Sequence, residues 1–234
     1  MQCFEKSGFN PAEDSLVVLG DVVDGWPDTR QVVDELLKCK HVIPILGNHD
    51  KWFMEWVDTG YAAPVWTSQG GLATINSYIE DAKVSNIGTY PQAPKEARDH
   101  VVAYFSKCHP WYLDETNNIY VHGGFNWTKP IDEQLTEELL WDRHMYEVAF
   151  MWKYRNNPYK FGDYNTVFIG HTTTQYSPIH SVKGSLEPFM YSNLINLDTG
   201  GGWSGKLTIM DVDSKEYWQS DLVPELYPEI EGRI

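Results

Sequence analysis

Near the start of the chain, two short apolar runs flank a segment in which apolar residues recur at helical spacing. Residues 15–19 and 41–46 are continuous apolar runs, which are typical of strands buried on both faces. Between them, valines and leucines in residues 30–38 fall on one face of a helix. This strand, helix and strand predict an α/β unit with a parallel sheet.

The same patterns predict the other elements. Residues 1–7 indicate the end of a helix that Gly8 terminates. Further helices are expected at 50–58, at 98–107 and, in two pieces, at 131–149, and further strands at 119–122, 166–169, 194–197, 206–211 and 216–219. Residues 60–71 are rich in turn residues. No repeat or linker divides the chain, so we expect a single domain over residues 1–234.

Composition narrows the classes of partner. The net charge is −15, which disfavours nucleic acid and anionic membranes because both would be repelled. No stretch approaches the roughly 18 apolar residues of a membrane span. Cys3, Cys39 and Cys108 lie far apart in the sequence, which favours reduced thiols over a disulfide framework or a zinc knuckle. We therefore expect a soluble, cytoplasmic protein that binds neither nucleic acid nor a membrane.

Four polar clusters each follow a predicted strand. They are Gly20-Asp21-x-x-Asp24-Gly25, Gly47-Asn48-His49-Asp50, His122-Gly123-Gly124 and Gly170-His171-Thr172. Ligands bind at the carboxyl ends of strands in open α/β sheets, so the clusters can form one site. Carboxylate, amide and imidazole groups suit manganese, iron, zinc or nickel better than calcium.

Each cluster taken alone also has an ordinary structural explanation. Asp21 could be a turn residue, and Asn48 with His49 could form an Asn-initiated turn. His122 could be a hydrogen-bonded core histidine, and His171 could cap a helix or fill a turn. Four such clusters in the order Asp, Asn-His, His, His are hard to explain as unrelated turns. The set as a whole favours a metal site.

The four motifs, in this order, resemble those of the calcineurin-like metallophosphoesterases. The resemblance runs from Ser15 to about Asp211, and the subgroup is the phosphoprotein phosphatase type, to which bacterial and phage serine/threonine phosphatases and diadenosine tetraphosphate hydrolases are related. It implies an α/β fold with four layers, in which a β-sandwich of mixed sheets is flanked by helices. It also implies two divalent metal ions at one edge of the sheets.

The resemblance implies metal ligands at matching positions. Asp21 would bridge the two ions, and Asn48, His122 and His171 would bind the second one. We expect Mn²⁺, with iron, zinc and nickel as alternatives. A metal-bound hydroxide would be the nucleophile, because two cations make water acidic and stabilise charge on the phosphoryl oxygens.

The resemblance further implies residues that act on the substrate. His49 would be the general acid that protonates the leaving oxygen, and Asp24 would orient its imidazole. Arg143 matches the family's phosphate-binding arginine, since a guanidinium can bind two phosphoryl oxygens at once. The alternative for Arg143 is an arginine on a helix surface. Asp198 matches a loop residue near the family's site, with a weaker case for a role in catalysis.

The family's first motif, Asp-x-His-Gly, does not occur in this sequence. In the family it follows the first strand, and its Asp and His bind the first ion. One explanation is that Met1 is an internal methionine and that the working protein has about 15–20 further residues and two ions. The other is a naturally shortened chain with one well-built metal site. We favour the first, because losing a central strand would expose apolar surface and unpaired backbone groups.

Two further departures affect phosphate binding. Gly25 and Leu46 stand where close protein phosphatases carry arginine, which weakens the case for a phosphoprotein substrate. A groove of tryptophans could instead stack on a base. The candidates are Trp26, Trp52, Trp56, Trp66 and Trp141. We expect at least three of these five to be core residues.

Three functions follow from these observations. The leading hypothesis is a metal-dependent phosphatase that acts on phosphomonoesters such as phosphoserine or phosphothreonine. The second is a hydrolase of dinucleoside polyphosphates, so phosphorylated small molecules, nucleotides and phosphoproteins are all candidate substrates. The third is a catalytically impaired, phosphatase-like binding module, which the missing first motif would favour. The complete second-metal set favours the two enzymes.

Overall fold

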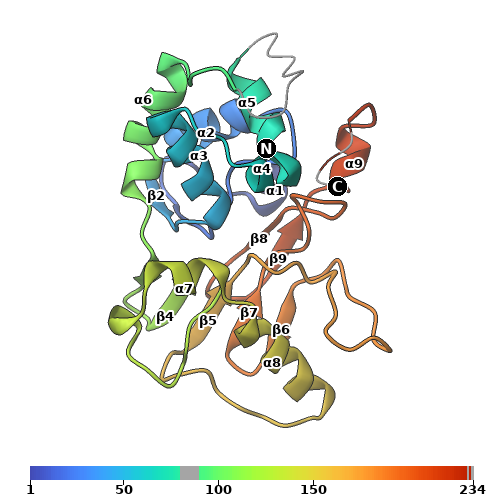
Figure 1. Ribbon diagram of the computed structural model, residues 1–234. Coiled ribbons are helices and arrows are strands. Elements are labelled where there is room, and N and C mark those ends of the chain that lie inside the picture. Colours follow the sequence, from blue (N-terminus) through green and yellow to red (C-terminus); the bar gives the residue numbers. More distant parts are fainter. Residues whose placement is uncertain (80–89, 231, 233–234) are drawn as a thin grey trace. The chain divides into compact units, whose positions relative to one another are not determined.

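The computed structural model of the protein describes residues 1–79, 90–230 and 232 (Figure 1). The chain divides into two compact units: unit 1 comprises residues 1–9 and 110–226, and unit 2 comprises residues 10–109 and 227–234. Each unit has its own cluster of buried apolar side chains. The single domain expected over residues 1–234 stays a prediction.

Unit 2 begins with the predicted strand, helix and strand. Strands β1 (Ser15–Val18) and β2 (His41–Pro44) pair in parallel, with Ser15 opposite His41, and α2 (Thr29–Lys38) connects them. This confirms the α/β unit that the apolar pattern indicates. Both strands end shortly before a polar cluster, at Gly20-Asp21 and at Gly47-Asn48.

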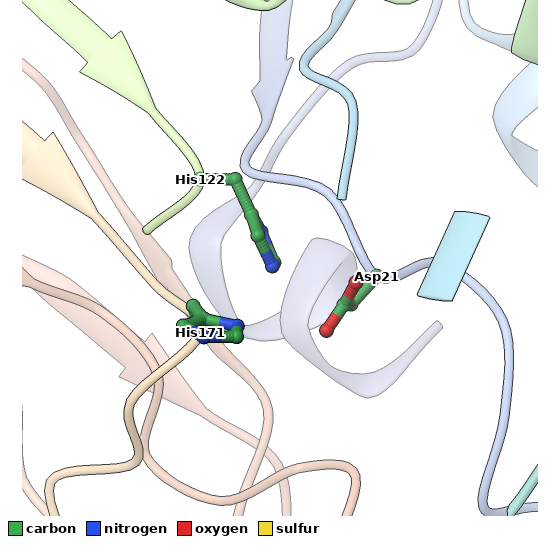
Figure 2. A group of neighbouring side chains, drawn as sticks. All are labelled: Asp21, His122 and His171. Carbon is green, nitrogen blue, oxygen red and sulfur yellow. The ribbon is translucent and has the colours of Figure 1, made fainter. Parts of the chain in front are cut away.

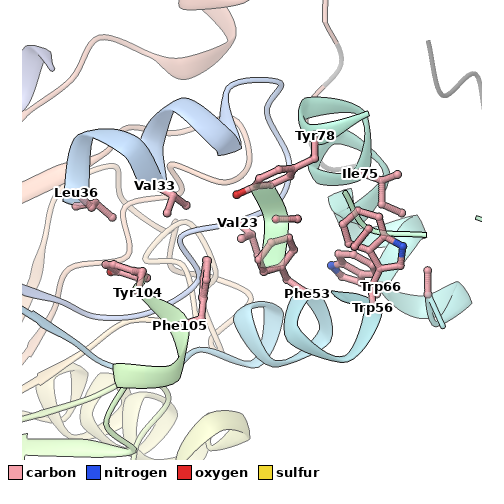
Figure 3. Close-up of a cluster of buried hydrophobic side chains, with 13 residues drawn as sticks. Val23, Val33, Leu36, Phe53, Trp56, Trp66, Ile75, Tyr78, Tyr104 and Phe105 are labelled. Carbon is pink, nitrogen blue, oxygen red and sulfur yellow. The ribbon is translucent and has the colours of Figure 1, made fainter. Parts of the chain in front are cut away.

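Helices complete unit 2 and enclose its core. They are α3 (Asn48–Thr59), α4 (Pro64–Trp66), the kinked π-helical turn η1 (Thr67–Gly71), α5 (Leu72–Tyr78), α6 (Lys95–Ala103) and the 3-10 turn η2 (Phe105–Lys107). Figure 3 shows the core that they share, in which the Phe53 ring lies 5.4 Å from that of Tyr78 and 4.9 Å from that of Phe105. The turn-rich residues 60–71 therefore contain helical structure, and α5 was not predicted.

Unit 1 is built on a five-stranded mixed sheet (Figure 1). Its strands, in spatial order, are β3 (Trp111–Leu113), β4 (Asn118–Val121), β5 (Thr166–Ile169), β7 (Leu194–Asn196) and β6 (Phe189–Tyr191). The three central strands run parallel, and the edge strands β3 and β6 are antiparallel to their neighbours. The polar clusters at His122 and His171 follow the central strands β4 and β5.

Alternate residues of the central strands face opposite sides of the sheet. Ile119 and Val167 belong to the apolar cluster that includes residues of α7 (Thr136–Trp141) and α8 (His144–Tyr154). On the other face, the rings of Tyr120 and Phe168 stack with centroids 4.9 Å apart, and the Lys215 ammonium lies over Phe168. Burial on both faces explains why these strands are continuously apolar in sequence.

A terminal helix and a hairpin complete unit 1. Helix α1 (Gln2–Ser7) ends at Gly8, as predicted, and Gly8 has a positive φ of 71°. It contacts the hairpin of β8 (Thr208–Met210) and β9 (Tyr217–Gln219), and Lys6 donates to the Gln219 carbonyl at 2.9 Å. The short elements η3 (Ile131–Glu133) and α9 (Val223–Leu226) were not predicted as separate helices.

The predicted fold class is confirmed: the chain has a mixed α/β fold in which helices flank a mixed sheet. No helix in the described part of the chain is long and apolar enough to cross a membrane. The three cysteines are free thiols, and Cys3 and Cys39 are buried.

Candidate active site

In unit 2, the loop after β1 is bonded to the first turn of α3. Asp50 is fully buried, and its carboxylate accepts hydrogen bonds from the backbone N–H groups of Asp21 (2.8 Å), Val22 (2.9 Å) and Gly47 (2.9 Å). In return, the N–H of His49 donates to Oδ1 of Asp21 at 3.0 Å. The free N–H groups and the dipole of a helix N-terminus favour a carboxylate there. The loop and the helix therefore hold each other in place.

The close approach of Asp21 to α3 requires a glycine. A Cβ atom on Gly47 would lie 2.2 Å from the Asp21 carboxylate oxygen and 2.3 Å from its backbone nitrogen. Asn48 follows as the first residue of the helix and is buried. Asp21 and Asp24 have positive φ values of 53° and 81°. Non-glycine residues in this region are uncommon and cluster at functional sites.

Asp24 and His49 form a buried pair. Nδ1 of His49 lies 2.5 Å from Oδ2 of Asp24, and their side chains are 5% and 0% exposed. The Trp66 indole N–H also donates to Oδ2, at 2.7 Å, and the Thr74 hydroxyl donates to Oδ1, at 2.6 Å. Because Nδ1 faces the carboxylate, Nε2 is the imidazole atom that can give a proton to a bound substrate. The rings of Trp52 and His49 form an edge-to-face pair, with centroids 5.0 Å apart and an interplanar angle of 80°.

In unit 1, strand pairing brings two histidines together. His122 follows β4 and His171 follows β5, and the N–H of Gly170 donates to the His122 carbonyl at 2.8 Å. The imidazole centroids are 5.0 Å apart at an interplanar angle of 60° (Figure 2). His122 is buried, and His171 has a positive φ of 62°. Figure 2 also labels Asp21, which belongs to unit 2.

Arg143 lies directly before α8 and reaches the loop that carries His171. Its Nη1 donates to the Thr172 hydroxyl at 3.0 Å and to the His171 carbonyl at 3.3 Å. The rings of Trp141 and His171 form an edge-to-face pair, with centroids 5.8 Å apart and an interplanar angle of 89°. The neighbouring Asp142 accepts a hydrogen bond from the Met145 N–H, and burial raises the pKa of its carboxyl. Arg143 is therefore anchored beside a predicted metal ligand.

Asp198 lies in the loop after β7 and helps to shape it. Its carbonyl accepts from the Thr174 N–H at 2.7 Å, and its carboxylate accepts from the Gly200 N–H at 3.0 Å. These bonds tie the loop to the segment that follows His171. A structural role accounts for both contacts.

The predicted site residues divide between the units. Unit 2 holds Asp21, Asp24, Asn48 and His49, and unit 1 holds His122, Arg143 and His171. Within each unit the predicted residues lie close together. Sequence analysis assigned no role to Asp50 or Thr74, and it named Trp66 only as a candidate for base stacking or for the core. Asp50 stands inside a recognised motif, but Trp66 and Thr74 are 42 and 50 residues from Asp24 and follow no pattern that points to it.

The five tryptophans do not behave as one group. Trp56 and Trp66 are fully buried, and the half-buried Trp52 packs against the same apolar cluster. This agrees with the expectation that at least three are core residues. Trp26 stacks on Tyr227 with centroids 5.2 Å apart, and Trp141 is exposed.

The donor types in both units fit a divalent transition metal. Unit 1 offers two adjacent imidazoles, and unit 2 offers a carboxylate and a buried amide. Nitrogen and oxygen donors of this kind suit manganese, iron, zinc and nickel. The chemistry of the residues is therefore compatible with the metal that the motifs indicate.

Comparisons with known proteins agree with this description. The family model for the calcineurin-like phosphoesterases matches residues 1–175. None of the curated proteins compared with the chain matches it. One similar solved structure is a protein provisionally described as a diadenosine tetraphosphatase, with a TM-score of 0.57, 18% identity, and coverage of 93% of this chain and 84% of that one. Another is a metallophosphoesterase from Sphaerobacter thermophilus, with a TM-score of 0.52, 15% identity, and coverage of 94% and 82%.

Proposed function

Because the chain belongs to the calcineurin-like phosphoesterase family and is thus a hydrolase of phosphoric esters, we propose that its substrates are phosphate monoesters. The observation that carries this proposal is the buried pair of His49 and Asp24 at the first turn of α3. When the P–O bond of a phosphate monoester breaks, the ester oxygen departs as an alkoxide or phenoxide, which is a poor leaving group unless it receives a proton. A histidine held by a carboxylate is suited to supply that proton.

Members of the family bind divalent metal ions, and we propose Asp21, Asn48, His122 and His171 as ligands in this chain. The support is the close placement of the first two in unit 2 and of the two histidines in unit 1. Mn²⁺ is the expected metal, with iron, zinc or nickel as alternatives. When bound, such an ion activates water and stabilises charge on the phosphoryl group.

His49 then protonates the leaving oxygen from Nε2, while Asp24 holds Nδ1. General acid catalysis of this kind contributes roughly 10²–10⁴-fold to the rate. Arg143 binds phosphoryl oxygens beside His171, where its contacts with Thr172 already place its guanidinium. Gly25 and Leu46 cannot bind phosphate through their side chains, so substrate affinity depends mainly on Arg143 and the metal.

The test is to measure metal content per chain together with manganese-dependent hydrolysis of nitrophenyl phosphate. The variant is His49→Asn, because the asparagine amide can still donate to Asp24 but offers no proton to the substrate. His180→Asn replaces an exposed histidine outside the site and serves as the matched control. We expect bound metal in all three proteins, similar activity in the wild type and the control, and a lower kcat in His49→Asn. A chain that binds metal tightly but hydrolyses nothing would instead support the impaired binding module.

A second candidate function is the hydrolysis of dinucleoside polyphosphates. It is favoured by the half-buried Trp52 beside His49 and the exposed Trp141 beside His171, because an indole can stack on a base. The provisional description of one similar structure as a diadenosine tetraphosphatase points in the same direction. Comparing kcat/KM for nitrophenyl phosphate and for diadenosine tetraphosphate separates the two functions. A cytoplasmic location is part of the proposal and rests on the three free cysteines.

A further inference from the structure

The Asp24 carboxylate is held by a segment much later in the chain. Trp66, at the end of α4, donates its indole N–H to Oδ2 at 2.7 Å, and Thr74, in α5, donates its hydroxyl to Oδ1 at 2.6 Å. Oδ2 is also the oxygen that contacts Nδ1 of His49. Each carboxylate oxygen therefore accepts a hydrogen bond from this segment. These two bonds fix the plane of the carboxylate independently of its contact with His49.

The backbone joins the same two regions. The N–H of Asp24 donates to the Thr74 hydroxyl at 2.9 Å, and the N–H of Gly25 donates to the Gly70 carbonyl at 3.2 Å. Gly70 has a φ of 102° inside the kinked turn η1, a conformation that favours glycine. The kink between Trp66 and Thr74 thus lets both side chains reach one carboxylate.

Burial makes these contacts hard to replace. Trp66 and Thr74 are both 0% exposed, and the Trp66 indole lies in the apolar core shown in Figure 3. A Cβ on Gly71 would lie 2.5 Å from the indole ring, so the backbone packs directly against it. Water cannot readily take the place of a lost donor here, and a carboxylate without its donors is expected to change its orientation or its hydrogen bonds.

We propose that Trp66 and Thr74 are positioning residues for proton donation by His49. They fix the Asp24 carboxylate, and the carboxylate fixes the imidazole so that Nε2 points toward the leaving oxygen. Neither residue contacts the substrate. This inference rests on the proposed function, because it assumes that His49 is the general acid.

The test compares Thr74→Val with Thr74→Ser. Valine matches threonine in shape but has no hydroxyl, whereas serine keeps the hydroxyl and loses only a methyl group. The substrates are phenyl phosphate, whose leaving group needs a proton, and dinitrophenyl phosphate, whose leaving group does not. For Thr74→Val we expect kcat with phenyl phosphate to fall about tenfold or more, because part of the contribution of general acid catalysis is lost. With dinitrophenyl phosphate we expect kcat to stay within about twofold of the wild-type value.

Thr74→Ser should restore kcat with phenyl phosphate to within about twofold of the wild type. Trp66→Phe should show the same selective loss as Thr74→Val, although it also removes part of the core. Three results would each overturn the positioning role. In the first, Thr74→Val lowers kcat equally with both substrates, and in the second it lowers kcat with neither. In the third, Thr74→Ser lowers kcat with phenyl phosphate as much as Thr74→Val does.

A second readout separates this inference from the proposed function. The ring nitrogen resonances of His49 are recorded by NMR in zinc-loaded protein, for the wild type and both Thr74 variants at one pH. We expect them to move in Thr74→Val and to stay in place in Thr74→Ser. If the wild type hydrolyses neither ester, the proposed function fails. Unchanged His49 resonances in Thr74→Val would overturn the positioning role, whatever the activity.

Discussion

The two units place their functional side chains in different ways. In unit 1, His122 and His171 come together because each follows a strand and the two strands are parallel neighbours. In unit 2, Asp24 and His49 come together through side-chain hydrogen bonds that involve Trp66 and Thr74 from a distant segment. Sheet pairing is enough to bring two proposed metal ligands side by side, whereas the orientation of the proposed proton donor depends on a buried network.

This difference predicts how each region responds to mutation. Replacing a histidine at a strand end removes a proposed metal ligand but leaves the backbone hydrogen bonds between the strands intact. Replacing a member of the buried network leaves a polar group without its partner, which costs about 1–3 kcal/mol of stability. Variants of His122 and His171 should therefore lose metal without unfolding, and variants of Asp24, Trp66 and Thr74 should lose the orientation of His49 and some stability.

The largest effect is expected from the strand-end histidines. His122→Ala or His171→Ala should lower metal content and reduce kcat/KM by about 10³-fold or more, because bound metal supplies several kcal/mol of charge stabilisation. Chelation of the metal from the wild type should have the same effect. Metal analysis, kinetics and circular dichroism would be compared with those of His180→Ala. Full metal content and activity in both variants would show that the two imidazoles are not ligands.

The buried pair should give the next largest effect. Asp24→Asn is expected to lower kcat with phenyl phosphate by about 10²-fold, within the range for general acid catalysis. It should also lower the free energy of unfolding by about 1–3 kcal/mol, because the amide cannot accept all the hydrogen bonds of the carboxylate. Kinetics and urea unfolding measure the two changes. A variant with wild-type kcat and metal content would remove Asp24 from the mechanism.

Arg143 should have a smaller effect, mainly on KM. Arg143→Ala removes a charge-assisted contact with phosphoryl oxygens, which corresponds to about 1.5–3 kcal/mol or roughly a tenfold or larger increase in KM. Arg155, at the end of α8, is also exposed, and Arg155→Ala is the control. If both substitutions change KM equally, the effect is one of general charge and Arg143 does not bind the phosphate.

The smallest effect concerns pH and Asp142. Burial raises the pKa of this carboxyl in the folded state, so the folded protein holds its proton more tightly than the unfolded chain does. Its contribution to stability is therefore greatest at low pH and declines as pH rises through the raised pKa. Asp142→Asn should remove this decline while keeping the bond to the Met145 N–H. Denaturant unfolding of the wild type and the variant, from below the ordinary pKa of an aspartate to above the raised one, measures the free energy of unfolding against pH. The same pH dependence in both proteins would contradict this role of Asp142.

The sequence predicted what depends on regular strands and known motifs. β5 was predicted at its observed bounds, and His122 and His171 were identified from their positions after strands. The pairing of Asp24 with His49 followed from the family resemblance. The strand is found because apolar runs mark buried strands, and the residues lie together because a motif keeps its residues at fixed spacing; their roles in metal binding and catalysis stay predictions.

The sequence could not reveal what depends on tertiary packing. The edge strands β3 and β6 were not predicted, and each joins the sheet through antiparallel pairing with one neighbour, which no local pattern reveals. Residues 60–71 showed only turn composition. In the structure they contain α4, which carries Trp66, and the kinked turn that leads to Thr74 in α5. Which distant donors reach Asp24 is decided by the fold of that segment, and no spacing rule connects them to it.

The most direct test of this account is the effect of His49→Asn on two phosphate esters in the presence of manganese. If His49 protonates the leaving oxygen, kcat should fall by roughly 10²–10⁴-fold with phenyl phosphate and far less with dinitrophenyl phosphate. Metal content should be unchanged. An equal fall with both esters, or no fall with either, would contradict the assignment of His49 as the general acid.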